Sequence, residues 1–257
     1  MSPSKVLIVA QYTFKELLKS KILLNVFIIG LGLMVLTYVA TEFTYGVPER
    51  IALDFGLGML SLSTLSISLF LGVGLLSKEV DSRTVYMVIS RPVSRQAFIF
   101  GKLLGLMSIQ AINLILLGSM TILSTMLLGG KLNTLIFWCI GFTYLESLML
   151  LLLVVLMSLV ANNIISILVS GVLLVLGHSV ESTMQTSFVK NTTWLGNVLE
   201  AYHFILPGFY KLNLKDFIIY KSSLPLEYLF SSFAYACLYS TFLIGLIIYI
   251  FNKKNLD

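Results

Sequence analysis

Charged residues are scarce in this sequence. Asp, Glu, Lys and Arg make up 11% of the 257 residues, whereas hydrophobic residues make up 58% and the mean hydropathy is +0.96. This balance lies well outside that of soluble globular domains. An ordinary soluble enzyme or binding module is therefore excluded, and we expect an integral membrane protein.

Residues suited to metal or redox chemistry are also few. The two cysteines, Cys139 and Cys237, lie in apolar segments without metal-ligand spacing, which favours packing as small hydrophobic side chains. The two histidines, His178 and His203, form no HExxH motif. We therefore expect neither a metal nor another cofactor on this chain.

A phosphate-binding loop is missing as well. The nearest string, Gly101-Lys102-Leu103, lacks the upstream glycine spacing and the following hydroxyl residue of such loops. We therefore expect that the chain does not hydrolyse ATP by itself. The net charge of +5 does not indicate nucleic-acid binding, because the basic residues lie beside hydrophobic segments, as membrane topology determinants do.

Long apolar runs dominate the remainder of the chain, and each is long enough to cross a bilayer. The predicted spans are residues 22–41, 55–76, 98–128, 133–160, 163–182 and 227–251. Short turns at Gly129-Gly130 and at 161–163 predict antiparallel hairpins. Eleven of the 17 Lys and Arg residues fall on the side of the termini in this assignment, which predicts cytoplasmic termini. We expect one all-α, polytopic membrane domain over residues 1–257, in a plasma membrane of the bacterial inner-membrane type.

Two segments outside these spans are also apolar. Residues 4–20 place Val6, Ala10 and Leu17 on one helical face and basic residues on the other, which predicts an amphipathic helix along the inner leaflet. Residues 183–226 are rich in aromatic side chains, which favour the headgroup level. Candidates for an outer gate in this segment are Trp194, Tyr202 and Phe209. A connector that only rests on the membrane is an equal alternative.

Glu146 stands nearly alone as a charged residue in the middle of a predicted span. A carboxylate at that depth usually faces a protein interior or water. We interpret it as a hydrogen-bonding contact between helices, to Asn113, Gln110 or a tyrosine hydroxyl, with a place on a substrate path as the alternative. His178 and Glu181 lie near the outer end of the fifth span and are interpreted as interfacial anchors.

The segment from Ser77 to Lys102 is the strongly charged exception in the first half of the chain. Residues Lys78 to Arg91 are compatible with a helix, Pro92 ends that helix, and Ser94 can cap the next one. A short helix fixed to a span at each end would pass a push from a soluble partner to the membrane as a rigid-body tilt. We therefore predict a cytoplasmic coupling helix in the loop over residues 77–97, between spans two and three.

Three motifs in and beside this loop resemble the permease subunits of ABC-2 type ABC transporters, in the branch with six spans and short loops. They are EVDSRT at 79–84, SRPVSR at 90–95 and GKLLG at 101–105. The amphipathic N-terminal helix and the closing residues 252–256 resemble that family too, and the overall layout is similar along the whole chain. The sequence departs from many members at Arg83, where they have glycine.

The resemblance implies a set of partners. Two permease subunits, identical or homologous, would pair in the membrane, and each would dock one ABC ATPase subunit that binds ATP and Mg. Membrane lipid and an outer-side accessory protein complete the expected partners, and nucleic acid is not among them. The residues assigned to ATPase coupling are Lys78, Glu79, Asp81, Arg83, Thr84, Val85, Val88, Arg91, Pro92 and Arg95.

The sequence leaves three functions open. The leading hypothesis is an ATP-driven export permease with a lipid-like or amphipathic substrate. The second is a membrane anchor that relays ATPase motion to an outer-side partner without transport. The third is an intramembrane hydrolase that uses Glu146, Glu181, His178 or His203.

Overall fold

The computed structural model describes residues 3–19, 21–43, 48–81, 94–190, 206–219 and 224–253, together with the single positions 194, 196, 199 and 202. Every regular element among these residues is helical, which confirms the all-α prediction for this part of the chain. The elements are α1 (Pro3–Lys19), α2 (Ile22–Glu42), α3 (Pro48–Asp81), α5 (Arg95–Leu127), α6 (Thr134–Val160), α7 (Asn163–Met184), α8 (Ser187–Lys190), the 3-10 helix η1 (Phe209–Leu212), α10 (Lys215–Ile219) and α11 (Leu226–Lys253).

Five of these helices are long and apolar enough to cross a membrane, counted over the described residues. They are α3, α5, α6, α7 and α11, whereas α2 contributes a shorter apolar stretch, Val26–Glu42. The chain is therefore a helical, membrane-integral protein. Five of the six predicted spans fall on these helices, although α3 begins at Pro48 rather than at residue 55. The predicted span at 22–41 falls on α2, which is not among the five.

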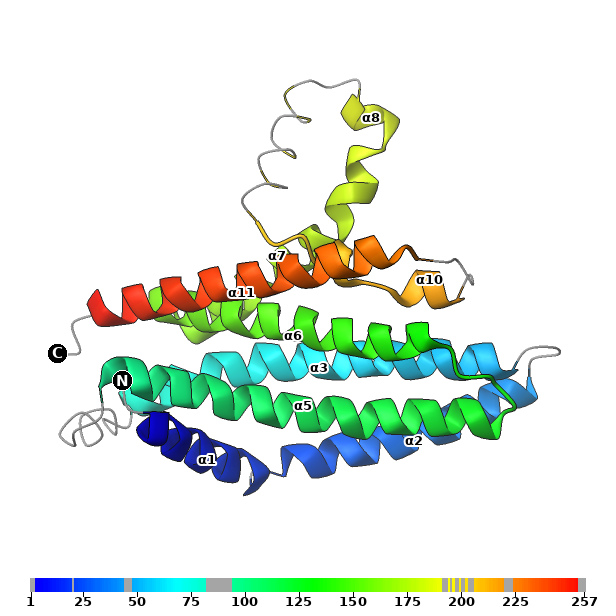
Figure 1. The fold of residues 1–257 in the computed structure, drawn as a ribbon, viewed down its shortest axis with the longest axis horizontal. Helices are drawn as coiled ribbons and strands as arrows, with labels where there is room; N and C mark the ends of the chain where they lie inside the picture. Colours follow the sequence, from blue (N-terminus) through cyan, green and yellow to red (C-terminus); the bar gives the residue numbers. More distant parts are fainter. Residues whose placement is uncertain are drawn as a thin grey trace.

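The long helices run in alternating directions through one bundle (Figure 1). α1, the end of α3, the start of α5 and the end of α11 lie at the left of the figure, and we call this the terminal end. The opposite end, where α2 ends and α11 begins, is the distal end. The end of α3 and the start of α5, which flank the charged loop along the chain, therefore both lie at the terminal end.

α6 is the central helix of this bundle. Of its most apolar window 72% is buried, against 22% for α7 and 17% for α11. Toward the terminal end, Leu152, Val155 and Leu159 of α6 pack with apolar residues of α5 and α11. Toward the distal end, Phe142 and Met149 join apolar residues of α3, η1 and α11. The other long helices are thus arranged around α6.

Polar side chains and one glycine set the helix ends. Ser94 Oγ accepts a hydrogen bond from the backbone N–H of Ala97 at 3.3 Å, which confirms the predicted cap of α5. Asn133 and Asn162 cap α6 and α7 in the same way. Gly129, with φ +83, ends α5 in the left-handed region that glycine favours. The two predicted hairpins, α5–α6 and α6–α7, are therefore present.

α1 packs along the first half of α5, where two glycines allow a close approach. A Cβ atom on Gly101 would lie 2.8 Å from the carbonyl oxygen of Val6, and one on Gly105 would lie 3.0 Å from that of Ala10. The order of these contacts makes the two helices parallel. Small residues four positions apart commonly bring membrane helices together, so the GKLLG motif serves here as a helix-packing seam.

Replacing Gly105 with alanine should loosen this seam. The new methyl group would lie 2.6 Å from Thr13 Cβ as well as close to Ala10, so α1 must shift, and we expect the free energy of unfolding to fall by about 1 kcal/mol. Gly245→Ala on α11 is the matched control, because no atom lies within 4 Å of its Cβ position. Unfolding of both variants in detergent checks this, and equal stabilities would contradict the close packing.

Candidate functional site

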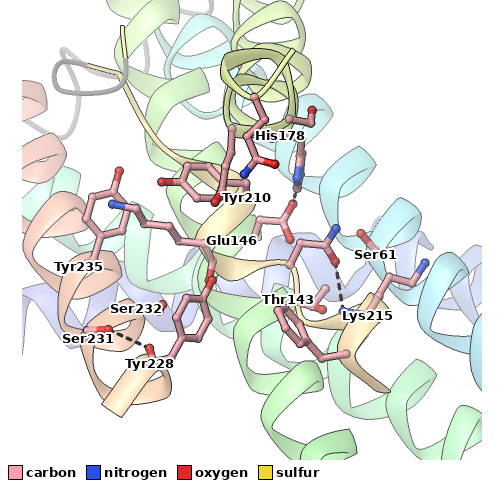
Figure 2. A pocket seen from close by; sticks show the side chains of 16 residues that line it. Ser61, Thr143, Glu146, His178, Tyr210, Lys215, Tyr228, Ser231, Ser232 and Tyr235 are labelled. Carbon is pink, nitrogen blue, oxygen red and sulfur yellow. Dashed lines mark hydrogen bonds and ion pairs between the residues drawn. The ribbon is translucent and has the colours of Figure 1, made fainter. Parts of the chain in front are cut away.

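A polar cavity of about 850 Å³ opens among α3, α6, α7, η1, α10 and α11, toward the distal half of the bundle (Figure 2). Phe217 alone among its lining residues lacks a polar side-chain atom. The others are Ser61, Thr143, Glu146, His178, Glu181, Ser182, Gln185, Tyr210, Lys211, Asn213, Lys215, Tyr228, Ser231, Ser232 and Tyr235. Such a lining is unusual among membrane helices, where polar groups are costly unless they face water or one another.

Glu146 and His178 form an ion pair or hydrogen bond between α6 and α7. Nε2 of His178 lies 2.8 Å from Oε1 of Glu146, and Figure 2 shows the two side chains pointing toward each other. When the carboxylate is ionised, Nε2–H is the donor. The geometry agrees with the interpretation of Glu146 as a contact between helices, but its partner is His178 rather than Asn113, Gln110 or a tyrosine. His178, predicted as an interfacial anchor, lies beside the cavity with 29% of its side chain exposed.

The second carboxylate oxygen of Glu146 faces the cavity. The side chain is only 3% exposed, yet Oε2 has no hydrogen-bond partner among the described residues and is not enclosed by protein. Glu146 lies twelve residues from the first residue of α6, which corresponds to about 18 Å along the helix axis. The cavity therefore brings a polar surface deep into the bundle.

The segment before α10 closes one side of the cavity against α7. Phe209 is fully buried, and its ring stacks on His178 with centroids 6.1 Å apart. Gly177 permits this contact, since a Cβ atom there would lie 2.6 Å from Phe209 Cδ2 and from the carbonyl oxygen of Pro207. On the other side, the backbone N–H of Gly208 donates to the Tyr235 hydroxyl at 2.8 Å. This segment thus packs between α7 and α11 and contacts both helices.

Two lysines contribute positive charge to the lining. The ammonium group of Lys211 lies 4.5 Å from the ring centroid of Tyr235 and 5.7 Å from that of Tyr210, both within cation–π range. Nζ of Lys215 lies beside α3, 3.3 Å from the position of a Cβ atom on Gly58. No hydrogen-bond acceptor for the Lys215 ammonium group is found among the described residues.

Tyr210 places a neutral hydroxyl at the cavity. Its burial, reinforced by the nearby negative charge of Glu181, raises the pKa of Tyr210 to about 12. The phenol therefore stays protonated at physiological pH and can donate a hydrogen bond. Within the described part of the chain, no three His, Cys, Asp or Glu side chains gather as a metal ion would require.

Buried amides on α5 belong to a second polar cluster, at the centre of α3, α5 and α6. Gln110 Nε2 donates to Ser68 Oγ, and Ser68 Oγ lies 2.9 Å from the carbonyl oxygen of Ser147. Asn113 Oδ1 accepts from Ser63 Oγ at 3.4 Å. The predicted role of Asn113 as a contact between helices is consistent with this geometry, but its partner is on α3.

The three residues predicted as an outer gate do not lie at one point. Phe209 is buried against α7, whereas Trp194 is 66% exposed. The Tyr202 hydroxyl donates to the carbonyl oxygen of Leu173 on α7, at 3.3 Å. Tyr202 and Phe209 therefore both pack on α7, and of the three only Phe209 touches the Glu146–His178 pair.

The residues predicted for ATPase coupling lie at the terminal end. Lys78, Glu79 and Asp81 belong to the last turns of α3, and Arg95 begins α5. For these four the structure describes the backbone but not the side chains. The remaining coupling positions lie outside the described residues; they are Arg83, Thr84, Val85, Val88, Arg91 and Pro92.

The sequence reasoning missed the basic and hydroxyl-bearing side of the cavity. The available signal was the polar content of the segments around Tyr210, Lys215 and Ser231, which are separated along the chain and meet only after folding.

Comparison with known proteins adds no assignment: no family model matches the chain, and a search of curated proteins finds no match.

Proposed function

We propose that the chain is the membrane permease subunit of an ATP-driven exporter, of the ABC-2 type that its loop motifs resemble. In this proposal α2 is the sixth crossing helix, the terminal end is cytoplasmic, and the distal cavity opens to the outside. Two copies of an ABC ATPase and a second permease subunit complete the complex. The chain itself carries no catalytic residue, and ATP and Mg bind to the ATPase.

The observation that carries the proposal is the length of α3. Its apolar span ends at Gly74, but the helix continues to Asp81 without a break. These seven further residues extend about 10 Å along the axis and include Lys78 and Glu79. A protein that docks on this extension would push directly on a helix that lines the cavity at Ser61, which suits the transmission of ATPase motion.

α1 supports the same arrangement. The apolar face predicted at Val6 and Ala10 packs on α5 instead of facing the leaflet. Leu7, Ile8 and Tyr12 are exposed on another face, and this second apolar surface suits burial at the membrane interface. Because Gly101 and Gly105 hold α1 against the first turns of α5, this interfacial helix would move together with the helix that follows the coupling loop. Both flanks of the loop are thus built into the bundle.

The alternative of an intramembrane hydrolase receives support only from the Glu146–His178 contact. A hydrolase of that kind also needs a nucleophile, or an activated water, next to the base. Thr143 lies one turn away, but its hydroxyl donates to the carbonyl oxygen of Cys139 at 2.9 Å. No Ser, Thr or Cys side chain hydrogen-bonds to either member of the pair within the described residues, so the geometry supplies no nucleophile for the hydrolase.

Reversing the charge of the α3 extension tests the proposal. We expect the tagged wild-type protein, purified in mild detergent, to bring along an ATPase that hydrolyses ATP. The double variant Glu79→Lys with Asp81→Lys should co-purify with much less of this ATPase, because complementary charges across an interface fix how two proteins dock. Glu42→Lys, the same change on an exposed residue at the distal end, should retain it.

Two results would speak against the exporter. One is the absence of any ATPase in the wild-type eluate, measured by mass spectrometry and hydrolysis. The other is equal recovery of the ATPase from the α3 variant and from the Glu42→Lys control, which would place the docking surface elsewhere.

A further inference from the structure

We propose that the distal cavity is a binding site for a zwitterion, in which an ammonium group and a phosphate or carboxylate are separated by a few atoms. This inference rests on the proposed function in one respect, namely that the bound molecule is what the exporter moves. The headgroup of a zwitterionic lipid and a free solute of the same kind share this chemistry. The binding site itself follows from the side chains of the cavity.

The ammonium group of the ligand is assigned to Glu146. Oε2 of this buried carboxylate points to the cavity and lacks a partner among the described residues, while Oε1 is held by His178 at 2.8 Å. A buried charge of this kind is costly unless it is paired. A ligand ammonium group satisfies Oε2 without displacing His178, and the hydroxyls of Thr143 and Tyr210 lie on the same lining.

The aromatic side chains of the cavity suit an ammonium group as well. Lys211 already holds its own ammonium group against the rings of Tyr235 and Tyr210. The rings of tyrosines attract cations through their negatively charged faces. This internal contact is an example, within the cavity, of the interaction that we assign to the ligand.

The anionic group of the ligand is assigned to Lys215. Its ammonium group lines the cavity, is partly buried beside Gly58, and has no acceptor among the described residues. Lys is a common point-charge partner of phosphate. In Figure 2, Lys215 lies on the side of Glu146 opposite to Tyr235 and extends away from the Glu146–His178 pair. Glu146 and Lys215 nevertheless line the same cavity, so a ligand inside it has access to both charges.

The balance of charges argues for a zwitterion over a simple ion. The lining carries two carboxylates, Glu146 and Glu181, and two ammonium groups, Lys211 and Lys215. A simple anion would leave Oε2 of the buried Glu146 without a partner and would approach its charge. A simple cation would leave Lys215 unpaired. Only a molecule with both charges satisfies both groups, and the cavity volume of about 850 Å³ exceeds what a small headgroup needs.

Binding to the isolated permease, without any ATPase, tests the site. We expect phosphoethanolamine to raise the thermal unfolding midpoint of the detergent-solubilised protein in a saturable way, whereas inorganic phosphate or ethanolamine alone at the same concentration should not. Glu146→Gln keeps an acceptor for His178 and should weaken binding by about tenfold or more, as expected for the loss of a charge-assisted hydrogen bond. Glu227→Gln, at an exposed acidic residue outside the cavity, should bind as the wild type does.

Lys215→Gln provides a second variant in case Glu146→Gln fails to fold. Its ammonium group makes no hydrogen bond among the described residues, so we expect a folded protein with a loss of binding similar to that of Glu146→Gln. Nanodiscs that contain phosphatidylethanolamine or phosphatidylglycerol distinguish the two sources. If phosphatidylethanolamine weakens phosphoethanolamine binding and phosphatidylglycerol does not, the site binds a lipid headgroup. If neither lipid weakens that binding, the site binds a free solute. Either result supports a zwitterionic ligand.

Several results would overturn the inference. They are equal stabilisation by phosphate or ethanolamine alone, no stabilisation by phosphoethanolamine, and unchanged affinity in folded Glu146→Gln and Lys215→Gln proteins. Because the assay contains no ATPase, binding without ATPase association would remove the exporter proposal and keep the site. ATPase association without phosphoethanolamine binding would keep the exporter proposal and remove the site.

Discussion

Replacing His178 with alanine should lower the free energy of unfolding by about 3 kcal/mol, because it leaves the buried carboxylate of Glu146 without its partner. Nε2 of His178 is the one protein group within hydrogen-bond distance of that carboxylate among the described residues. Chemical or thermal unfolding in detergent measures the loss. The same substitution also removes the ring on which Phe209 stacks, which adds to the effect.

A second substitution separates these two contributions. If the unpaired charge dominates, Glu146→Gln in the His178→Ala background should recover most of the lost stability, because a neutral amide costs less to bury than a carboxylate. If packing against Phe209 dominates, the double variant should stay as unstable as His178→Ala alone. A loss below about 1 kcal/mol in His178→Ala would contradict a buried ionised pair.

Replacing Gly177 with alanine should displace the segment that closes the cavity. The added methyl group would lie 2.6 Å from both Phe209 Cδ2 and the carbonyl oxygen of Pro207. The carbonyl is backbone and cannot rotate away, so the segment must move off α7. We expect a loss of about 2 kcal/mol in the free energy of unfolding, in the range found for overpacked interiors.

The matched control lies on the same helix. Gly171→Ala places its methyl group where no atom lies within 4 Å, and it should be neutral or slightly stabilising. Limited trypsin digestion gives a local readout at Lys211, which is half-buried in η1. Faster cleavage there in Gly177→Ala than in Gly171→Ala would report the displaced segment, and identical digestion patterns would show that α7 and Phe209 are not in close contact.

Local sequence features predicted the helices well. Apolar runs of more than 20 residues, the turn at Gly129-Gly130 and the cap at Ser94 each act over a few neighbouring residues, and each prediction agrees with the structure. The start of α3 was missed, because Pro48 begins the helix ahead of the apolar run. Proline fits the first turn of a helix, where its missing N–H is not needed.

The candidate site was harder to predict because its side chains come from distant parts of the chain. Glu146 was recognised as unusual, but its partner is 32 residues away and was assigned to the interface. That assignment assumed that residues near the end of a span face headgroups. Here the segment around Phe209 covers α7 at Gly177 and His178, and His178 bonds to Glu146. The alternation of apolar and polar residues along one helix carries no information about such a cover.

The deep burial of α6 determines which parts of this protein can move. A helix with 72% of its apolar window enclosed cannot shift without disturbing its neighbours, whereas most of the apolar windows of α7 and α11 are not buried within this chain. α6 is therefore the fixed helix against which movement of the other helices can be measured. If the chain works as the proposed exporter, distance labels on α6 should stay still during the cycle, and labels on α7 should report the displacement of the surrounding helices.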